Sequence, residues 1–557
     1  MKKGQIYEGT AIEVDFPDKA AVLTKETDKD GNENEYKVMV KGALQGQKVK
    51  YVLQKARTGK YKGRLLEVLK SSPEETQKPV CRHFGICGGC TYQTLPYQAQ
   101  LELKKKQVLK LLGTVLEEGS YTFDGILPSP CEWGYRNKME FSFGDEYKGG
   151  PLSLGLHKKG SIHDIINVSG CKIINNDYTK VLDCIRGHFS SRNIPHYNKN
   201  THTGILRHLL VRRAASTGEM LIALVTASGM EDSLCLGQLG KELENLELEG
   251  TITGFLHIIN DGLGDVVKSD KTRIISGRDW ITEEILGLKF RISVFSFFQT
   301  NTKGSEVLYN CIRNYITGKP AGVVFDLYSG TGTIAQIIAP VAGKVTGVEI
   351  VEEAVMAAKQ NAADNRLSNC NFIAGDVLKV LDGINEKPDF IILDPPREGI
   401  NPKALKKIGR DMKAPGMVYI SCKPTSLVKD LAELQEYGYK ADRVCCVDMF
   451  PQTGHVETVC LLSKLHSDQH IEVELQMDEL DLTAAESKAT YEEIKDYVLE
   501  HTGLKVSSLY IAQVKEKCGI IERVNYNLPK SENSRQPKCP PEKEAAIRET
   551  LEYFRMI

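Results

Sequence analysis

The amino-acid sequence predicts a multidomain protein with a small antiparallel β-barrel, then an α+β domain, then a doubly wound α/β domain. The chain has 557 residues, which exceeds the ~250–300 at which a single hydrophobic core stops growing. Apolar and polar residues alternate over the first 70 positions, whereas short apolar runs alternate with helical segments from 290 to 465. Hydrophobic residues make up 41% and charged residues 26% of the chain, so we expect most of it to fold.

Residues 1–70 form the predicted barrel, because their alternating runs are short and are broken by Gly, Asp and Asn. Between Lys41 and Lys70 there are nine Lys or Arg residues and one acidic residue, Glu67. A basic face on an OB-like barrel suits the phosphate backbone of a nucleic acid. The alternative is a solvated face on a purely structural barrel.

Three closely spaced cysteines, Cys81, Cys87 and Cys90, lie near the start of the predicted central α+β domain at 75–289. Thiolates of this kind bind either zinc or an iron–sulfur cluster. Zinc ribbons usually pair two Cys-x-x-Cys units, and here only Cys87 and Cys90 have that spacing. The spacing therefore favours an iron–sulfur cluster, and a fourth ligand must come from elsewhere in the chain.

Neither export nor membrane anchoring is indicated by the sequence. No run approaches the ~20 apolar residues of a membrane span, and the first residues lead directly into strand-like alternation. In this context the fifteen cysteines predict reduced thiols, a metal centre or catalysis rather than disulfides. We expect a cytoplasmic protein with no membrane partner.

Five apolar runs of the α/β domain each end in a polar or glycine-rich cluster. In open α/β sheets, ligands bind outside the carboxyl ends of the strands, so five such endings predict a ligand site at that edge. The endings are Asp326 with the loop up to Thr333, Glu349, Asp376, Asp394 with Pro395 and Pro396, and Ser421 with Cys422.

The first of these loops, DLYSGTGT at 326–333, indicates the class of ligand. It lacks the third glycine of the dinucleotide fingerprint and the lysine of a P-loop, so a bound pyrophosphate is not favoured. Glu349 ends the second strand, where an acid can hydrogen-bond both ribose hydroxyls of a nucleoside. Together these features indicate S-adenosylmethionine. The alternative is a plain turn and a surface glutamate.

Cys422 is the candidate nucleophile. It precedes Lys423 and Pro424, and Pro424 is predicted to occupy the first position of a helix. A thiol beside a helix N-terminus and a lysine should have its pKa lowered from the reference of about 8.5. The alternative is an inert buried thiol. Arg397 follows the Asp-Pro-Pro motif where enzymes that methylate exocyclic amines usually have an aromatic residue, so amine methylation is disfavoured.

Five motifs, in this order, resemble the RNA (uracil-5-)-methyltransferase family, whose members modify transfer or ribosomal RNA. They are FFQTN (297–301), DLYSGTGT (326–333), DPPREG (394–399), SCKP (421–424) and HVETV (455–459). The resemblance covers about 1–465, and residues 1–70 resemble the family's RNA-binding TRAM barrel. One departure is Ser293-Val294-Phe295, where the family usually has Ser-Pro. This departure should alter only how the chain enters the strand.

The resemblance implies a role for each of ten residues. Cys422 would be the nucleophile and Glu457 the general base of uridine C5 methylation. The residues expected to bind S-adenosylmethionine in a class I methyltransferase domain at 290–465 are Gln299, Tyr328, Glu349 and Asp394. The expected ligands of a 4Fe–4S cluster are Cys81, Cys87, Cys90 and Cys171, with Cys131 as the rival of Cys171. Phe297 or Phe298 would stack on the target uridine, although a core role is equally expected for either ring.

The expected partner is RNA, and family analogy favours 23S ribosomal RNA over the T-loop of transfer RNA. We expect a monomer. A noncatalytic RNA-binding or folding factor on the same scaffold is the alternative from another functional class, and the intact Cys422 and Glu457 argue against it.

Residues 466–557 lie outside the resemblance and are predicted to form an acidic linker and a small helical extension. Between Asp468 and Glu500 there are eleven acidic residues and two basic residues. Residues 491–517 have the pattern of two short helices. A helical hairpin is favoured over a helix-turn-helix motif, and the sequence assigns this extension no role.

Overall fold

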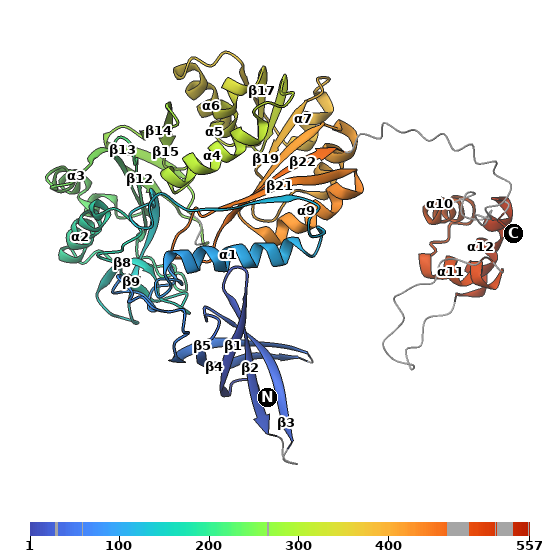
Figure 1. Ribbon diagram of the computed structural model, residues 1–557, viewed down its shortest axis with the longest axis horizontal. Coiled ribbons are helices and arrows are strands. Elements are labelled where there is room, and N and C mark those ends of the chain that lie inside the picture. Colours follow the sequence, from blue (N-terminus) through green and yellow to red (C-terminus); the bar gives the residue numbers. More distant parts are fainter. Residues whose placement is uncertain are drawn as a thin grey trace. The chain divides into compact units, whose positions relative to one another are not determined.

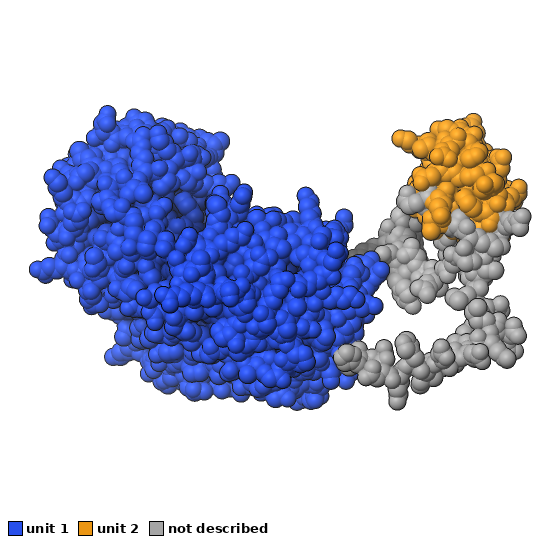
Figure 2. Space-filling view, turned by 90° about the horizontal axis from the view of Figure 1, so that it is seen from above, with its two compact units in different colours: residues 1–466 blue, residues 467–557 orange. Residues whose placement is uncertain are grey.

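The computed structural model describes residues 1–27, 32–57, 59–264, 267–464, 490–518, 520, 539–554 and 556–557. The chain divides into two compact units, residues 1–466 and 467–557, which Figure 2 shows in different colours. Among the described residues, no helix combines the length and apolar character that crossing a lipid bilayer requires.

The N-terminal strands close into the predicted barrel (Figure 1). Its core is built from small and β-branched side chains around the fully buried Tyr51. One detail differs from the prediction, because β3 and β5 pair in parallel while the other neighbours are antiparallel. A barrel with an odd number of strands cannot close with every pair antiparallel. The strands, in the order β1-β2-β3-β5-β4, are β1 (Ile6–Asp15), β2 (Lys19–Thr27), β3 (Glu33–Lys41), β5 (Lys60–Lys70) and β4 (Lys48–Arg57).

The central α+β region is a seven-stranded sheet with two helices packed on its core. Its order is β13-β12-β11-β10-β7-β8-β9, and only β11 and β12 pair in parallel within this described sheet. The elements are β7 (Lys138–Asp145), β8 (Leu152–His157), β9 (Ile165–Asn167), α2 (Asn176–Ser191), β10 (Leu206–Arg213), β11 (Glu219–Thr226), a 3₁₀ turn (Glu231–Leu234), α3 (Leu236–Glu244), β12 (Thr251–Ile259) and β13 (Lys271–Gly277). A hairpin of β14 (Trp280–Ile285) and β15 (Leu288–Ser293) follows.

The third sheet has eight strands in the order β18-β17-β16-β19-β20-β22-β21-β6, and its first five strands are parallel. All five predicted apolar runs are strands of this sheet. The strands are β16 (Val323–Leu327), β17 (Lys344–Glu349), β18 (Cys370–Ala374), β19 (Phe390–Leu393), β20 (Gly416–Ser421), β21 (Tyr439–Val447) and β22 (Glu457–Lys464).

Helices cover both faces of this sheet, as expected for a doubly wound fold. Alternate strand residues enter two separate cores, one shared with α4, α5 and α6 and the other with α1, α7, α8 and α9. The helices are α1 (Tyr97–Leu112), α4 (Thr302–Ile316), α5 (Thr333–Ile338), α6 (Glu352–Asp364), α7 (Val377–Gly383), α8 (Pro402–Lys406) and α9 (Pro424–Glu436). A 3₁₀ turn (Ala339–Val341) and a π-helical turn (Lys407–Met412) complete the set.

The predicted domain boundary at 289/290 does not separate the sheets. Strand β6 (Thr122–Leu127), within the predicted central domain, pairs in parallel with β21 and forms one edge of the eight-stranded sheet. Phe123 and Ile126 of β6 pack against the same core as α1. The boundary failed because this pairing joins segments more than 300 residues apart, which local apolar periodicity does not reveal.

The second unit contains α10 (Tyr491–Thr502), α11 (Ser508–Lys517) and α12 (Pro541–Tyr553), which share a small apolar core. The two predicted helices are confirmed, and α12 was not anticipated. Thr490 and Glu493 form a capping box that begins α10. Most of the predicted acidic linker, residues 465–489, lies outside the described residues.

Candidate active site

The predicted site residues meet at one edge of the eight-stranded sheet. Asp326 lies near the end of β16, Glu349 ends β17, and Asp394 and Cys422 directly follow β19 and β20. Strand β22 runs the opposite way, so its first residue, Glu457, lies at the same edge. The parallel strands bring Asp326, Glu349, Asp394 and Cys422 to this edge, as the strand-end argument predicted. The antiparallel β22 adds Glu457, which only the family resemblance had singled out.

The glycine-rich loop after β16 is tied to Glu349. The N–H groups of Tyr328 and Ser329 both donate to the Val348 carbonyl, at 2.9 and 3.0 Å. The Gly330 N–H donates to Oε2 of Glu349 at 3.0 Å, so the carboxylate and the loop form one rigid rim. Tyr328 has a φ of +70°, a left-handed conformation that is uncommon for a side-chain-bearing residue and is often found at ligand sites.

Two buried polar atoms near this loop have no hydrogen-bond partner among the described residues: Oδ1 of Asp326 and Oγ of Ser329. The other oxygen of Asp326 accepts the Ala335 N–H at 3.0 Å. Burial, together with a smaller effect of the Asp394 carboxyl, raises the pKa of Asp326 to about 8. Unpartnered buried polar atoms are typical of a site that a ligand completes. Sequence reasoning noted Asp326 as a strand end and gave it no role.

The FFQTN segment borders the same loop. Asn301 caps α4 by accepting the Gly304 N–H at 2.9 Å, and the Gln299 side chain is 8% exposed. Phe298 is buried against Phe290, so it belongs to the core. Phe297 is 66% exposed, and its carbonyl accepts the Thr331 hydroxyl at 3.3 Å. Of the two rings considered from the sequence, Phe297 is the one accessible to a ligand.

Cys422, Arg397, Asp394 and Glu457 form one electrostatic group. The pKa of the Cys422 thiol is raised to about 11, chiefly by burial and then by Glu457 and Asp394, although the Arg397 side chain, which hydrogen-bonds the thiol, lowers it. The expectation of a lowered Cys422 pKa was therefore wrong. Burial and two adjacent carboxyls outweigh a helix N-terminus, and the cation at the thiol is Arg397.

Glu457 is buried and its carboxyl is unusually basic. Its pKa is raised to about 8, chiefly by burial and then by the Asp394 carboxyl, although Arg397 lowers it. Burial also raises the pKa of Asp394, to about 7. A carboxylate of this basicity suits proton transfer near neutral pH better than an exposed glutamate would.

Comparison with known proteins shows the family to which the chain belongs. The sequence model of the tRNA (uracil-5-)-methyltransferase family matches residues 259–465. An uncharacterized RNA methyltransferase of Clostridium acetobutylicum is 47% identical over 464 residues, which cover 83% of this chain and 99% of the relative. The chain belongs to the RNA uracil-5-methyltransferase family. An uncharacterized RNA methyltransferase of Caldanaerobacter subterraneus is 45% identical. The matched residues make up 76% of this methyltransferase and 93% of the relative.

The methyltransferase also shares its fold with a solved structure. The tRNA (uracil-54, C5)-methyltransferase of Pyrococcus abyssi in complex with S-adenosyl-L-homocysteine has a TM-score of 0.64 and 22% sequence identity. The match covers 82% of this chain and 99% of that one. The predicted class I methyltransferase fold is therefore confirmed.

The four predicted cluster cysteines of the methyltransferase line a single pocket. Cys81, Cys87, Cys90 and Cys171 surround about 390 Å³ of space, open solvent included, whereas Cys131 is exposed. The Gly89 N–H donates to the Cys87 sulfur at 3.3 Å. Among the described residues, no group of three or more His, Cys, Asp or Glu side chains is placed to hold a metal ion.

Proposed function

We propose that this methyltransferase methylates C5 of a uridine in 23S ribosomal RNA, with Cys422 as nucleophile and Glu457 as general base. The observation that carries this proposal is the position of both residues at one edge of neighbouring strands, with Asp394 and Arg397 beside them. Uridine C5 is a weak nucleophile and its C5 proton must be removed, so the reaction needs both a thiolate and a base.

The proposed reaction regenerates the Cys422 thiolate and replaces the proton on C5 of the uridine with a methyl group. The Cys422 thiolate, stabilised by Arg397, adds to C6 and moves an electron pair toward C5, which then attacks the methyl group. S-adenosylmethionine would supply this methyl group when bound, and its sulfur would leave as the thioether S-adenosylhomocysteine. The Glu457 carboxylate next takes the C5 proton, the C5–C6 double bond re-forms, and the C6–S bond breaks to release the thiolate.

Gln299, Tyr328, Glu349 and Asp394 are the proposed residues that hold S-adenosylmethionine. The hydrogen bond between Gly330 and Glu349 and the unpartnered Ser329 hydroxyl support a nucleoside at this rim. Each Glu349 oxygen accepts one backbone N–H and keeps a second lone pair for a ribose hydroxyl. The methyl acceptor must be unstacked to expose C6, and the exposed ring of Phe297 is the proposed stacking partner.

Cys81, Cys87, Cys90 and Cys171 are the proposed ligands of a 4Fe–4S cluster. Thiols around one zinc ion lie within about 4 Å of each other, because each Zn–S bond is about 2.3 Å long. A cluster has its irons at separate corners and holds four thiols further apart. The support for this proposal is that four thiols, which are the ligands of 4Fe–4S clusters, line one pocket.

Ribosomal RNA remains the favoured substrate by family analogy, and the barrel supports RNA binding. Lys55 of β4 lies directly opposite Lys62 of β5, and Lys60, Lys62 and Arg64 are exposed. Like charges in cross-strand pairs are destabilising, so such a surface is typical of one that meets a polyanion. Transfer RNA is the second candidate, because the matching family model and the Pyrococcus abyssi enzyme are described for transfer RNA.

The experiment that separates these substrates is mass-spectrometric mapping of 5-methyluridine in ribosomal and transfer RNA from cells with and without the gene. Loss of the modification from 23S ribosomal RNA alone is the expected result. Its loss from the T-loop of transfer RNA would move the proposal to the second candidate. We further propose that the enzyme acts as a monomer in the cytoplasm.

A further inference from the structure

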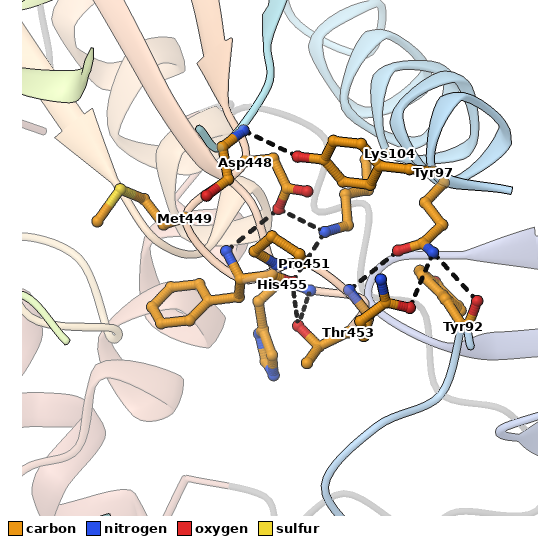
Figure 3. A network of polar contacts seen from close by, with 12 residues as sticks. Tyr92, Tyr97, Lys104, Asp448, Met449, Pro451, Thr453 and His455 are labelled. Carbon is orange, nitrogen blue, oxygen red and sulfur yellow. Dashed lines mark hydrogen bonds and ion pairs between the residues drawn. The ribbon is translucent and has the colours of Figure 1, made fainter. Parts of the chain in front are cut away.

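The loop between β21 and β22, residues 448–456 and named here the base loop, leads directly into Glu457. Its first residue, Asp448, forms an ion pair of 2.6 Å with Lys104 of α1, and both side chains are fully buried. The two residues are 344 positions apart in the sequence. Figure 3 shows Lys104 reaching from α1 to Asp448. Helix α1 therefore contacts the segment that carries the candidate base.

Lys104 and Asp448 also bond to the base-loop backbone on both sides of Phe450. Nζ of Lys104 donates to the Phe450 carbonyl at 3.1 Å, and the Phe450 N–H donates to Oδ1 of Asp448 at 3.1 Å. The Phe450 carbonyl also accepts the Thr453 hydroxyl at 2.8 Å. The first turn of the base loop is thus fixed by a side chain from α1.

Gln100, one helical turn before Lys104, holds the middle of the base loop. Its Nε2 donates to Oε1 of Gln452 at 3.0 Å, and its Oε1 accepts the Gln452 N–H at 2.9 Å. Gln452 has a φ of +69°, a strained conformation that persists only where its surroundings enforce it. The N–H groups of Thr91 and Tyr92, adjacent to Cys90, donate to the Gln452 carbonyl at 2.9 and 3.1 Å.

Stability alone does not account for the Lys104–Asp448 pair. Burial removes both charges from water, and apolar residues of similar size often stabilise a fold equally well or better. A buried ion pair is best explained when it selects one conformation of the chain among several. Here the selected arrangement is that of the base loop, and a displacement of about 1 Å at a reacting group can slow a reaction roughly 100-fold.

We propose that Lys104 and Gln100 of α1 are positioning residues that hold the base loop so that Glu457 faces C5 of the bound uridine. This inference rests on the proposed role of Glu457. Lys104 is fully buried, so it acts through the loop and not by contact with RNA. Its loss should slow removal of the C5 proton while leaving addition by Cys422 and methyl transfer intact. The enzyme should then accumulate as a covalent adduct with RNA.

The test uses the full chain and unmodified transcripts of 23S ribosomal RNA and of a transfer RNA, each made with uridine or with 5-fluorouridine. Adducts are quantified by denaturing electrophoresis in the presence of S-adenosylmethionine. With ordinary uridine, Lys104→Met and Gln100→Leu should each resolve the adduct roughly 10–100-fold more slowly than the wild type. With 5-fluorouridine, which offers no removable proton, both should form adduct at the wild-type rate.

Matched controls lie on the same helix. Lys105→Met and Gln98→Leu change side chains of the same type that are half-buried and exposed, and both should behave as the wild type. The double variant Lys104→Met with Asp448→Leu replaces the ion pair by an apolar pair. This double variant should recover the thermal stability lost in Lys104→Met and still accumulate adduct. If Lys104 only stabilised the fold, restoring the stability would also restore adduct resolution.

Each outcome gives a decision. Wild-type resolution in folded Lys104→Met and Gln100→Leu, while Glu457→Gln accumulates adduct, overturns the positioning role and leaves the base assignment standing. No adduct in Glu457→Gln itself overturns the base assignment and this inference with it. A general fall in adduct formation on 5-fluorouridine also contradicts positioning, because it means that the site as a whole is damaged. If Lys104→Met does not fold, Gln100→Leu alone decides, since it removes no charge.

Discussion

Cys422 and Glu457 lie one residue beyond the Ser421–Thr458 pair that joins β20 to the antiparallel β22. The register of two backbone strands therefore sets the separation of the proposed nucleophile and base. Because both strands are buried on both faces, this register is strongly specified.

Arg397 is the cation that most affects the Cys422 thiol. Arg397→Gln should raise the Cys422 pKa further and slow alkylation by iodoacetamide near neutral pH, by about tenfold for each pKa unit. Lys423→Gln should alkylate at the wild-type rate. The measurement is the pH profile of alkylation at Cys422, read by mass spectrometry. A larger effect from Lys423→Gln would restore the original expectation that the helix start governs this thiol.

Glu349 should be required for cofactor affinity rather than for folding. Glu349→Gln replaces a charged acceptor at the rim of the glycine-rich loop, so the dissociation constant for S-adenosylmethionine should rise roughly 10–100-fold. Isothermal titration calorimetry measures this change. Glu353→Gln, on the first turn of α6, is the matched control and should bind normally. If both variants bind S-adenosylmethionine with equal affinity, Glu349 does not contribute to cofactor binding.

Three raised carboxyl pKa values predict how the stability of the enzyme depends on pH. The pKa of Glu457 rises from 4.5 to about 8, that of Asp326 from 3.8 to about 8, and that of Asp394 from 3.8 to about 7. The folded state therefore holds protons that the unfolded chain has lost. The contribution of these bound protons to the stability of the fold is fully present below about pH 4, and it is lost as the pH rises toward 8.

Glu457→Gln should accordingly flatten the fall of Tm between pH 5 and 8, because an amide has no proton to lose. Calorimetry across this range is the measurement. Glu436→Gln, at an exposed position of α9, should leave the slope unchanged. An unaltered slope in Glu457→Gln would mean that this carboxyl is ionised in the folded enzyme.

The cysteine pocket should carry an iron–sulfur chromophore. Protein purified without oxygen is expected to absorb visible light, and Cys81→Ser should abolish this absorbance because it removes one thiolate ligand. Cys131→Ser is the control and should keep the chromophore, since Cys131 is exposed. Stoichiometric zinc without iron would contradict the assignment.

Local sequence patterns predicted the features that depend on short segments. Five apolar runs became β16 to β20, and Pro424 became the first residue of α9. Cys422 followed because the fold class fixes where strand ends meet. Glu457 came from the family resemblance, since periodicity and the rule for open sheets did not single it out.

Features that depend on distant segments or on burial were missed. The pairing of β6 with β21 and the bond between Lys104 and Asp448 each join parts of the chain more than 300 residues apart. The direction of the Cys422 pKa shift was wrong because local neighbours were weighed without the desolvation that the surrounding strands impose. Charge and spacing along a sequence do not show which side chains leave water.

Covalent trapping tests the proposed mechanism most directly. With 5-fluorouridine at the target position, the Cys422 thiolate can add to C6 and the methyl group can transfer, but no proton can be removed from C5. Wild-type enzyme incubated with S-adenosylmethionine and this RNA should therefore give an adduct that survives denaturing electrophoresis, and Cys422→Ala should give none. An adduct that persists in Cys422→Ala, or full methylation of uridine by that variant, would contradict the account.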